Sequence, residues 1–175
     1  MWISTLNREM DFGYSAMRML LDLCDEDKLD WKPSEDNNWW TLGQLIRHTT
    51  QACGWCCKGM VDGVWDMDAL GYPVDADPDG LLPASQQPSV ESLAHARALL
   101  DEDDKLAREM IAKAGEERLE SEQLEAPWGT KGTLGQLMLD SATHLNAHKT
   151  QLFYYLKLLG KPVNTPILYG MADHV

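Results

Sequence analysis

Residues 133–160 read TLGQLMLDSATHLNAHKTQLFYYLKLLG, and this stretch predicts the clearest helix of the chain. Thr133 and Gln136 have the spacing of a capping box, in which the hydroxyl and the amide satisfy backbone N–H groups at a helix start. Apolar residues follow at steps of three and four, while Gly160 and Pro162 mark the end. One face of this helix is therefore expected to pack on a core.

The five-residue sequence TLGQL, which we call the repeated word, occurs twice, at residues 41–45 and at residues 133–137. The first copy opens a second predicted helix, over residues 41–60. The repetition suggests two related helix pairs, which would form an antiparallel four-helix bundle with long connections. Alternatively, the two words converged because capping boxes draw on few residue types, and the sequence leaves both interpretations open.

The spacing of apolar residues predicts two further helices. One keeps a helical period from Ile3 to Cys24 near the N-terminus. The other follows Ser89, which we expect to be its N-cap, and ends near Gly115. Four helices of this kind favour an all-α fold.

The sequence also predicts the character of the connections between the helices. Residues 66–88 contain four prolines together with glycines and aspartates, which predicts a long crossing loop without any regular element. Residues 127–129, Pro-Trp-Gly, predict an irregular or hairpin segment before the last helix. We expect residues 1–175 to form a single domain, since this length supports one core.

The charge of the chain restricts its partners. It has 15 basic and 28 acidic residues, a net charge of −13, and this field repels nucleic acid and anionic lipid. No stretch approaches the length of a bilayer-spanning helix, and the N-terminal residues lack the pattern of a signal peptide. We therefore expect a cytoplasmic protein that binds neither nucleic acid nor membranes.

Three histidines fall on the core-facing stripes of two predicted helices. His144 and His148 are four residues apart, so their side chains lie about 40° apart around the axis and about 6 Å apart along it. A histidine pair at this spacing is a weak signal alone, but His48 on the helix that starts at residue 41 strengthens it. Three neutral imidazoles predict a divalent metal site with open positions. The other two histidines are expected to be solvated: His95 and His174.

Two polar residues near the pair can orient its rings. Asp140 lies one turn before His144, and Gln151 lies in the turn after His148. Each can accept the N–H of the imidazole nitrogen that does not bind metal. The alternative is that Asp140 is a solvated helix charge and Gln151 a helix-surface amide. Asp140 is also our candidate for a catalytic base, beside Tyr154 and Tyr155.

The four cysteines are expected to be free thiols, because their spacing is too tight for a framework of long-loop disulfides. The stretch Cys53-Gly54-Trp55-Cys56 is spelled like a redox or zinc motif. We expect it to lie three turns into the helix over residues 41–60, away from the helix start that would lower a thiol pKa. The favoured interpretation is therefore that these cysteines are small buried hydrophobic residues. Cys56 lies about 12 Å along the axis from His48 and cannot share its ion.

Residues 40–48, WTLGQLIRH, and residues 144–160, HLNAHKTQLFYYLKLLG, resemble the second and final helices of the DinB-like (DinB/YfiT) metal-binding bundles. The resemblance implies an antiparallel four-helix bundle with long connections, usually a homodimer. It also implies that His48, His144 and His148 bind zinc, nickel or a similar ion. One departure is Lys149, where such proteins commonly have an arginine with its bidentate fork.

Characterised members of this superfamily include transferases of low-molecular-weight thiols. The resemblance therefore implies a metal-dependent enzyme in which the ion activates a thiol or water, of the thiol S-transferase or hydrolase type. The partners of such an enzyme would be a small-molecule substrate and a low-molecular-weight thiol. The alternative is a non-catalytic, stress-associated dimeric bundle that binds a metal or small ligand.

Overall fold

The structure is a computed structural model that describes residues 1–36, 38–71 and 82–171. Its elements, in chain order, are α1 (Trp2–Asp22), η1 (Glu26–Lys28), α2 (Leu42–Thr49), α3 (Gly54–Asp62), η2 (Asp68–Leu70), η3 (Ala84–Gln86), α4 (Leu93–Ser121), β1 (Gln123–Glu125), β2 (Lys131–Thr133), α5 (Leu134–Leu158) and α6 (Thr165–Leu168).

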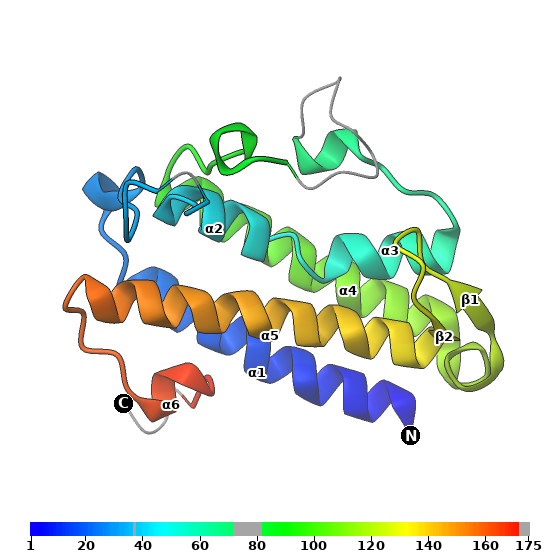
Figure 1. The fold of residues 1–175 in the computed structure, drawn as a ribbon. Helices are drawn as coiled ribbons and strands as arrows, with labels where there is room; N and C mark the ends of the chain where they lie inside the picture. The colour runs from blue at the N-terminus through cyan, green and yellow to red at the C-terminus, as the bar shows by residue number, and fades with distance from the viewer. Residues whose placement is uncertain (37, 72–81, 172–175) are drawn as a thin grey trace.

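The long helices form the predicted antiparallel bundle (Figure 1). Helices α1 and α5 lie side by side and run in one direction, while α4 and the pair α2–α3 run in the opposite direction. Helices α2 and α3 follow one another and together occupy one of the four positions. Helix α3 ends at one end of the bundle and α4 begins at the opposite end, so the connection between them has to span the length of the bundle, as a long crossing loop does.

Both copies of the repeated word start a helix with a capping box. The Thr41 side chain accepts from the Gln44 backbone and the Gln44 side chain accepts from the Thr41 backbone, at 3.2 and 2.8 Å. The same exchange joins Thr133 and Gln136 at the start of α5, at 3.3 and 2.8 Å. The capping-box predictions are therefore confirmed, and they set the start of the two helices that carry the histidines.

The prediction of one helix over residues 41–60 is wrong, because the chain breaks between α2 and α3. Asp103 on α4 accepts the backbone N–H groups of Cys53, at 3.4 Å, and Trp55, at 3.1 Å, and so caps the start of α3. A Cβ on Gly54 would lie 2.2 Å from the Asp103 carbonyl oxygen, so only glycine allows this approach. The new helix start is held by α4 rather than by its own sequence.

Helix α4 starts later than predicted, and the end predicted near Gly115 corresponds to a break within a longer element. Its N-cap is Ser92, whose side chain accepts from the His95 backbone at 3.0 Å. Ser89 instead packs against Gly43: a Cβ added to Gly43 would lie 2.3 Å from the Ser89 hydroxyl oxygen. Gly115, with φ 71° and ψ 165°, interrupts the helix, but the chain resumes helical structure to Ser121.

The connections are more structured than expected. Strand β1 pairs antiparallel with β2, so the segment around residues 127–129 is a hairpin turn. The prediction that residues 66–88 contain no regular element is wrong, since η2 and η3 are short 3-10 helices. Residues 72–81 of this loop lie outside the described residues.

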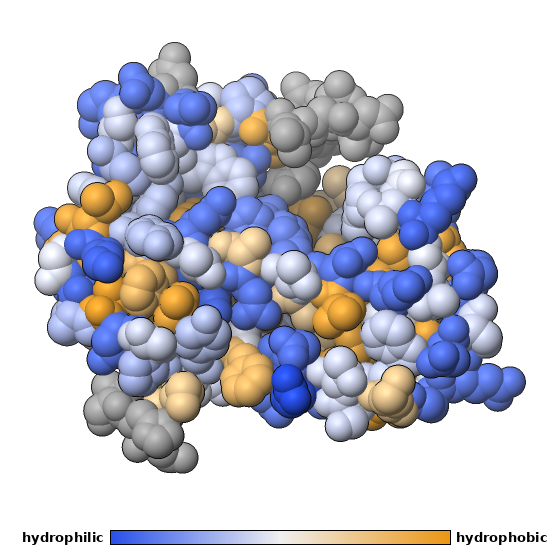
Figure 2. All heavy atoms as spheres, turned by 60° about the horizontal axis from the view of Figure 1, so that its bottom comes forward, coloured by the Kyte–Doolittle hydropathy of each residue, from blue (hydrophilic) through white to orange (hydrophobic). Residues whose placement is uncertain are grey.

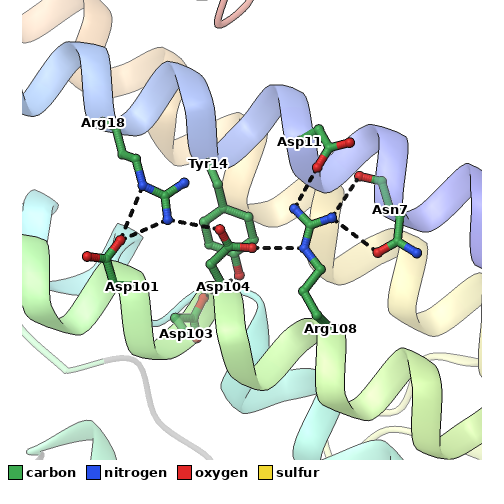
Figure 3. Close-up of polar contacts among 8 residues, drawn as sticks. All are labelled: Asn7, Asp11, Tyr14, Arg18, Asp101, Asp103, Asp104 and Arg108. Atoms are coloured by element: carbon green, nitrogen blue, oxygen red, sulfur yellow. Dashed lines mark hydrogen bonds and ion pairs between the residues drawn. The ribbon is translucent and has the colours of Figure 1, made fainter.

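The outer surface between α1 and α4 carries a chain of ion pairs (Figure 3). Arg18 contacts Asp101 and Asp104, at 2.8 and 2.9 Å. Arg108 contacts Asp104 at 3.0 Å and Asp11 at 2.8 Å. These exposed and half-exposed pairs align the two helices while adding little stability each.

The face of the molecule turned forward in Figure 2 is mainly hydrophilic, with hydrophobic residues in separate groups. Within residues 1–36, 38–71 and 82–171, no helix is long and apolar enough to cross a bilayer.

Candidate metal centre

Three histidine rings converge between α2 and α5. His48 Nε2 lies 3.2 Å from His144 Nε2 and 3.1 Å from His148 Nε2. The ligand atoms that these three residues offer all lie within 4.8 Å of one another. The structure thus brings together the three histidines that the sequence singled out, and the group can hold a metal ion.

The spacing of the nitrogens fits a common ion better than a network of hydrogen bonds. A neutral imidazole Nε2 carries at most one proton, so His48 cannot donate a full hydrogen bond to both neighbours. Nitrogens about 2.0–2.1 Å from a tetrahedral zinc ion lie about 3.3 Å apart. The separations of His48 Nε2 from the other two Nε2 atoms are close to that value, so this geometry suits ligands of one shared ion.

The surroundings keep the imidazoles neutral, which is the form that binds metal. Burial and then the neighbouring His148 and His144 lower the pKa of His48 to about 3. Burial also lowers the pKa of His144, against a smaller opposing hydrogen bond to the Ala52 backbone. For His148, burial lowers the pKa while the Gln151 side chain opposes the shift.

Two of the rings have a second partner outside the cluster. The His148 Nδ1 atom lies 2.8 Å from the Gln151 side-chain oxygen, as a carbonyl that accepts the ring N–H would. The His144 ring interacts with the backbone of Ala52, in the break between α2 and α3. Sequence reasoning missed Ala52, because a continuous helix would have used that carbonyl internally.

Asp140 does not form the hydrogen bond to the His144 ring that its position in the sequence suggested. Its side chain is exposed and lines a pocket beside His144. In the part of the chain that the structure describes, no hydrogen bond joins Asp140 to the His144 ring. The carboxylate therefore faces the pocket rather than orienting a ligand.

Trp40 forms one wall of the centre and was not singled out from the sequence. Its ring stacks on His148 with an interplanar angle of 19° and a centroid distance of 6.0 Å. It also lies 5.0 Å from the His48 ring at a tilted angle. Its position immediately before the Thr41 cap was the signal available, since that position commonly carries a packing residue.

The Cys-Gly-Trp-Cys stretch lies at the start of α3, with Cys53 as the N-cap, so the prediction that it lies three turns into a helix is wrong. A helix start alone would favour a reactive thiolate. The surroundings have the opposite effect here: burial raises the pKa of Cys56 to about 12, and a hydrogen bond with Cys57, followed by burial, raises the pKa of Cys53 well above its usual value. All four cysteines are free and buried, which confirms their interpretation as small buried hydrophobes.

His95 stays apart from the cluster. His95 is partly exposed in the first turn of α4, where its Nδ1 accepts from the Glu91 backbone at 3.3 Å. His174 lies outside the described residues.

A pocket of about 1000 Å³ adjoins the histidines, and we call it the triad pocket. His48 and His144 form part of its wall, together with residues of α3, the segment after α3, and the β1–β2 turn. Three tryptophans lie in that wall: Trp55, Trp65 and Trp128. A volume of this size accommodates a typical small-molecule ligand.

Comparison with curated proteins finds no match for this chain. Comparison with protein families finds the DinB superfamily, whose model matches residues 9–152. The matched region is well over half of the chain and contains His48, His144 and His148. On this evidence the chain belongs to the DinB superfamily.

Proposed function

We propose that this protein is a metal-dependent enzyme of the thiol S-transferase or hydrolase type. The observation that carries the proposal is the convergence of three imidazole nitrogens, from His48, His144 and His148, beside the triad pocket. A divalent ion with open coordination positions lowers the pKa of a thiol or water that it binds, and so supplies a nucleophile at neutral pH.

The side chains around the triad prepare the histidines for this role. Gln151 accepts the Nδ1 proton of His148, which leaves the Nε2 lone pair directed into the cluster. Trp40 covers the rings of His48 and His148 and restricts their rotation. Both effects hold the ligand nitrogens in place before a metal arrives, and this preorganisation favours binding.

The triad pocket supplies the place for the reacting partner. Two of the three histidines form part of its wall, so a small molecule in the pocket lies next to the nucleophile. Asp140 is an exposed carboxylate on the same wall. We propose that it accepts the proton that the thiol or water releases, provided that the substrate brings that proton within reach.

The test combines metal content with turnover. We expect the purified protein to carry close to one divalent ion per chain, measured by inductively coupled plasma mass spectrometry. We expect the loaded protein to consume an electrophile with glutathione, bacillithiol or mycothiol, or to hydrolyse an ester. The His144→Ala variant should lose metal and turnover together, whereas His95→Ala, which changes a histidine outside the cluster, should keep both.

Two outcomes of this test would count against the enzyme proposal. Full metal content without turnover of any thiol or ester would favour the second class, a non-catalytic metal-binding bundle. Full metal content in a folded His144→Ala variant would remove the metal site itself.

We also propose that the protein is a homodimer, as the family resemblance implies. In support, Tyr154 and Leu158 expose large apolar side chains on α5, with exposed fractions of 59% and 66%. Light scattering after size exclusion measures the mass directly, and a mass equal to one 19.7 kDa chain would contradict the proposal.

A further inference from the structure

We propose that the triad pocket selects an uncharged, flat aromatic molecule, which stacks against Trp55, Trp65 and Trp128. This inference rests on the proposed function, because it names the class of acceptor that would meet the nucleophile. The argument starts from the indole rings of the wall and the way in which the chain holds them.

The three indoles form a continuous aromatic surface. The Trp55 and Trp65 rings lie 5.1 Å apart at an angle of 62°, and the Trp65 and Trp128 rings lie 5.5 Å apart at 78°. They come from three separate elements: α3, the segment after it, and the β1–β2 turn. Rings brought together from three elements act as one wall, and their edge-to-face arrangement leaves ring faces for a ligand.

The chain fixes the orientation of two of these rings. The Trp55 indole N–H donates to the Asp66 carbonyl at 2.7 Å, which leaves its hydrocarbon face for the pocket. Trp65 lies directly over Gly59, where an added Cβ would come within 2.4 Å of the indole. A glycine at this position therefore allows the Trp65 ring to lie flat against α3, so the wall is formed before a ligand binds.

Trp128 lies at the open edge of the wall. It is 54% exposed, although it is a large apolar side chain in a turn. An exposed tryptophan that continues a row of half-buried ones is the arrangement expected at the rim of a binding site, where a ligand covers it.

Among the described residues, the wall of the pocket holds one carboxylate and one guanidinium, so its charged groups favour an ion of neither sign. Asp140 is an exposed carboxylate in the wall, and the chain as a whole carries a net charge of −13. The Arg47 guanidinium in the same wall donates to the Ala69 and Leu70 carbonyls, both at 3.4 Å, and so is engaged in holding the segment after α3. An uncharged ring with a polar substituent fits these groups best.

The test compares an aromatic ligand with its saturated counterpart. The probes are 2-naphthol and decahydro-2-naphthol, which share a bicyclic skeleton and one hydroxyl group. Using isothermal titration calorimetry of the metal-free protein, we expect 2-naphthol to bind roughly tenfold more tightly, because ring contacts with indoles add to simple apolar burial. Equal affinity for the two probes would overturn the inference.

Variants locate the binding surface. We expect Trp65→Leu and Trp128→Leu each to reduce the preference for 2-naphthol to threefold or less. Trp39→Leu is the matched control, because Trp39 is also partly exposed but packs near Tyr155, at 6.1 Å between ring centroids, and does not line the pocket. Trp128 is exposed, so its variant should fold even if Trp65→Leu does not. An unchanged preference in the Trp128 variant would overturn the inference.

The same experiment keeps the two proposals apart. Binding to the metal-free protein tests the aromatic wall and does not depend on turnover. If 2-naphthol binds with the expected preference while the metal-loaded protein turns over no electrophile, the enzyme proposal fails and the aromatic site stands. If turnover occurs without any aromatic preference, the opposite conclusion holds.

Discussion

The hydroxyl of Tyr14 on α1 donates a 2.8 Å hydrogen bond to the carboxylate of Asp103 on α4, inside the bundle and beneath the ion pairs of Figure 3. The same carboxylate accepts the backbone N–H groups of Cys53 and Trp55 at the start of α3. One buried side chain therefore joins three helices, and one of them provides part of the triad pocket.

Replacing this carboxylate should destabilise the fold. We expect Asp103→Ala to lower the free energy of unfolding by about 2–4 kcal/mol, because it leaves the Tyr14 hydroxyl and the start of α3 without a partner. Urea denaturation measures the change. The control is Asp101→Ala, which removes an exposed pairing with Arg18 and should cost less than about 1 kcal/mol. Equal losses in the two variants would contradict this role of Asp103.

Asp103 should also give the stability a pH dependence. Burial raises the pKa of Asp103 to about 6, above the 3.8 of an unperturbed aspartate. Between these values the folded state keeps a proton that the unfolded state has lost, so stability contributed by this group falls as the pH rises from 4 through 6. We expect the wild type to lose stability over this range relative to Asp103→Asn. A constant difference between the two proteins from pH 4 to pH 7 would rule this out.

The contact between His148 and Gln151 predicts a change in metal affinity. Removing the amide frees the ring to rotate or to change tautomer, so we expect Gln151→Ala to weaken metal binding by about 10–100-fold. Competition with a chelator measures the affinity. Asp140→Asn is the comparison, because Asp140 faces the pocket: it should leave the affinity unchanged while it lowers turnover.

Metal binding should stabilise the folded state, and the lowered histidine pKa values should extend this effect to mild acid. Because a divalent ion binds the folded triad, saturating zinc or nickel should raise Tm. With the pKa of His48 lowered to about 3, and those of His144 and His148 also lowered, the shift should persist at pH 5.5. Differential scanning fluorimetry at pH 7.5 and 5.5 measures it. A shift of the same size in His148→Ala would show that the ion binds elsewhere.

Gly59 offers a test of the aromatic wall that leaves every tryptophan in place. Gly59→Ala should push the Trp65 indole away from α3, because the new methyl group would overlap the ring. We expect a change in near-ultraviolet circular dichroism and a weaker preference for 2-naphthol, with far-ultraviolet circular dichroism preserved. Gly63→Ala is not a suitable control, since Gly63 has φ 71° and its substitution strains the backbone.

Much of the fold and of the centre was predictable because its signals are local. The capping boxes at Thr41 and Thr133 set two helix starts, and the spacing of His144 and His148 follows from helical geometry. His48 could be assigned to the same centre because its place relative to the cap put it on the inner face. These features depend on residues a few positions apart.

The missed features depend on residues distant in sequence. The end of α2 is not encoded near Thr49, since the start of α3 depends on Asp103 of α4, about fifty residues later. The glycines of the repeated word show the same dependence: a Cβ on Gly43 would lie 3.1 Å from the Leu29 carbonyl, and one on Gly135 2.7 Å from that of Leu119. Both copies of the word therefore meet the same packing requirement at a helix start.

The break between α2 and α3 allows these two helices to respond differently when an ion binds. Helix α2 carries His48 and packs on α5, whereas α3 packs mainly on α4 and is tied to it by Asp103. A shift of α2 as an ion enters or leaves can be absorbed by the four residues between Thr49 and Gly54. The part of the pocket wall that α3 contributes, including Trp55, would then keep its position in both the loaded and the empty protein, so that the aromatic surface does not depend on ion uptake.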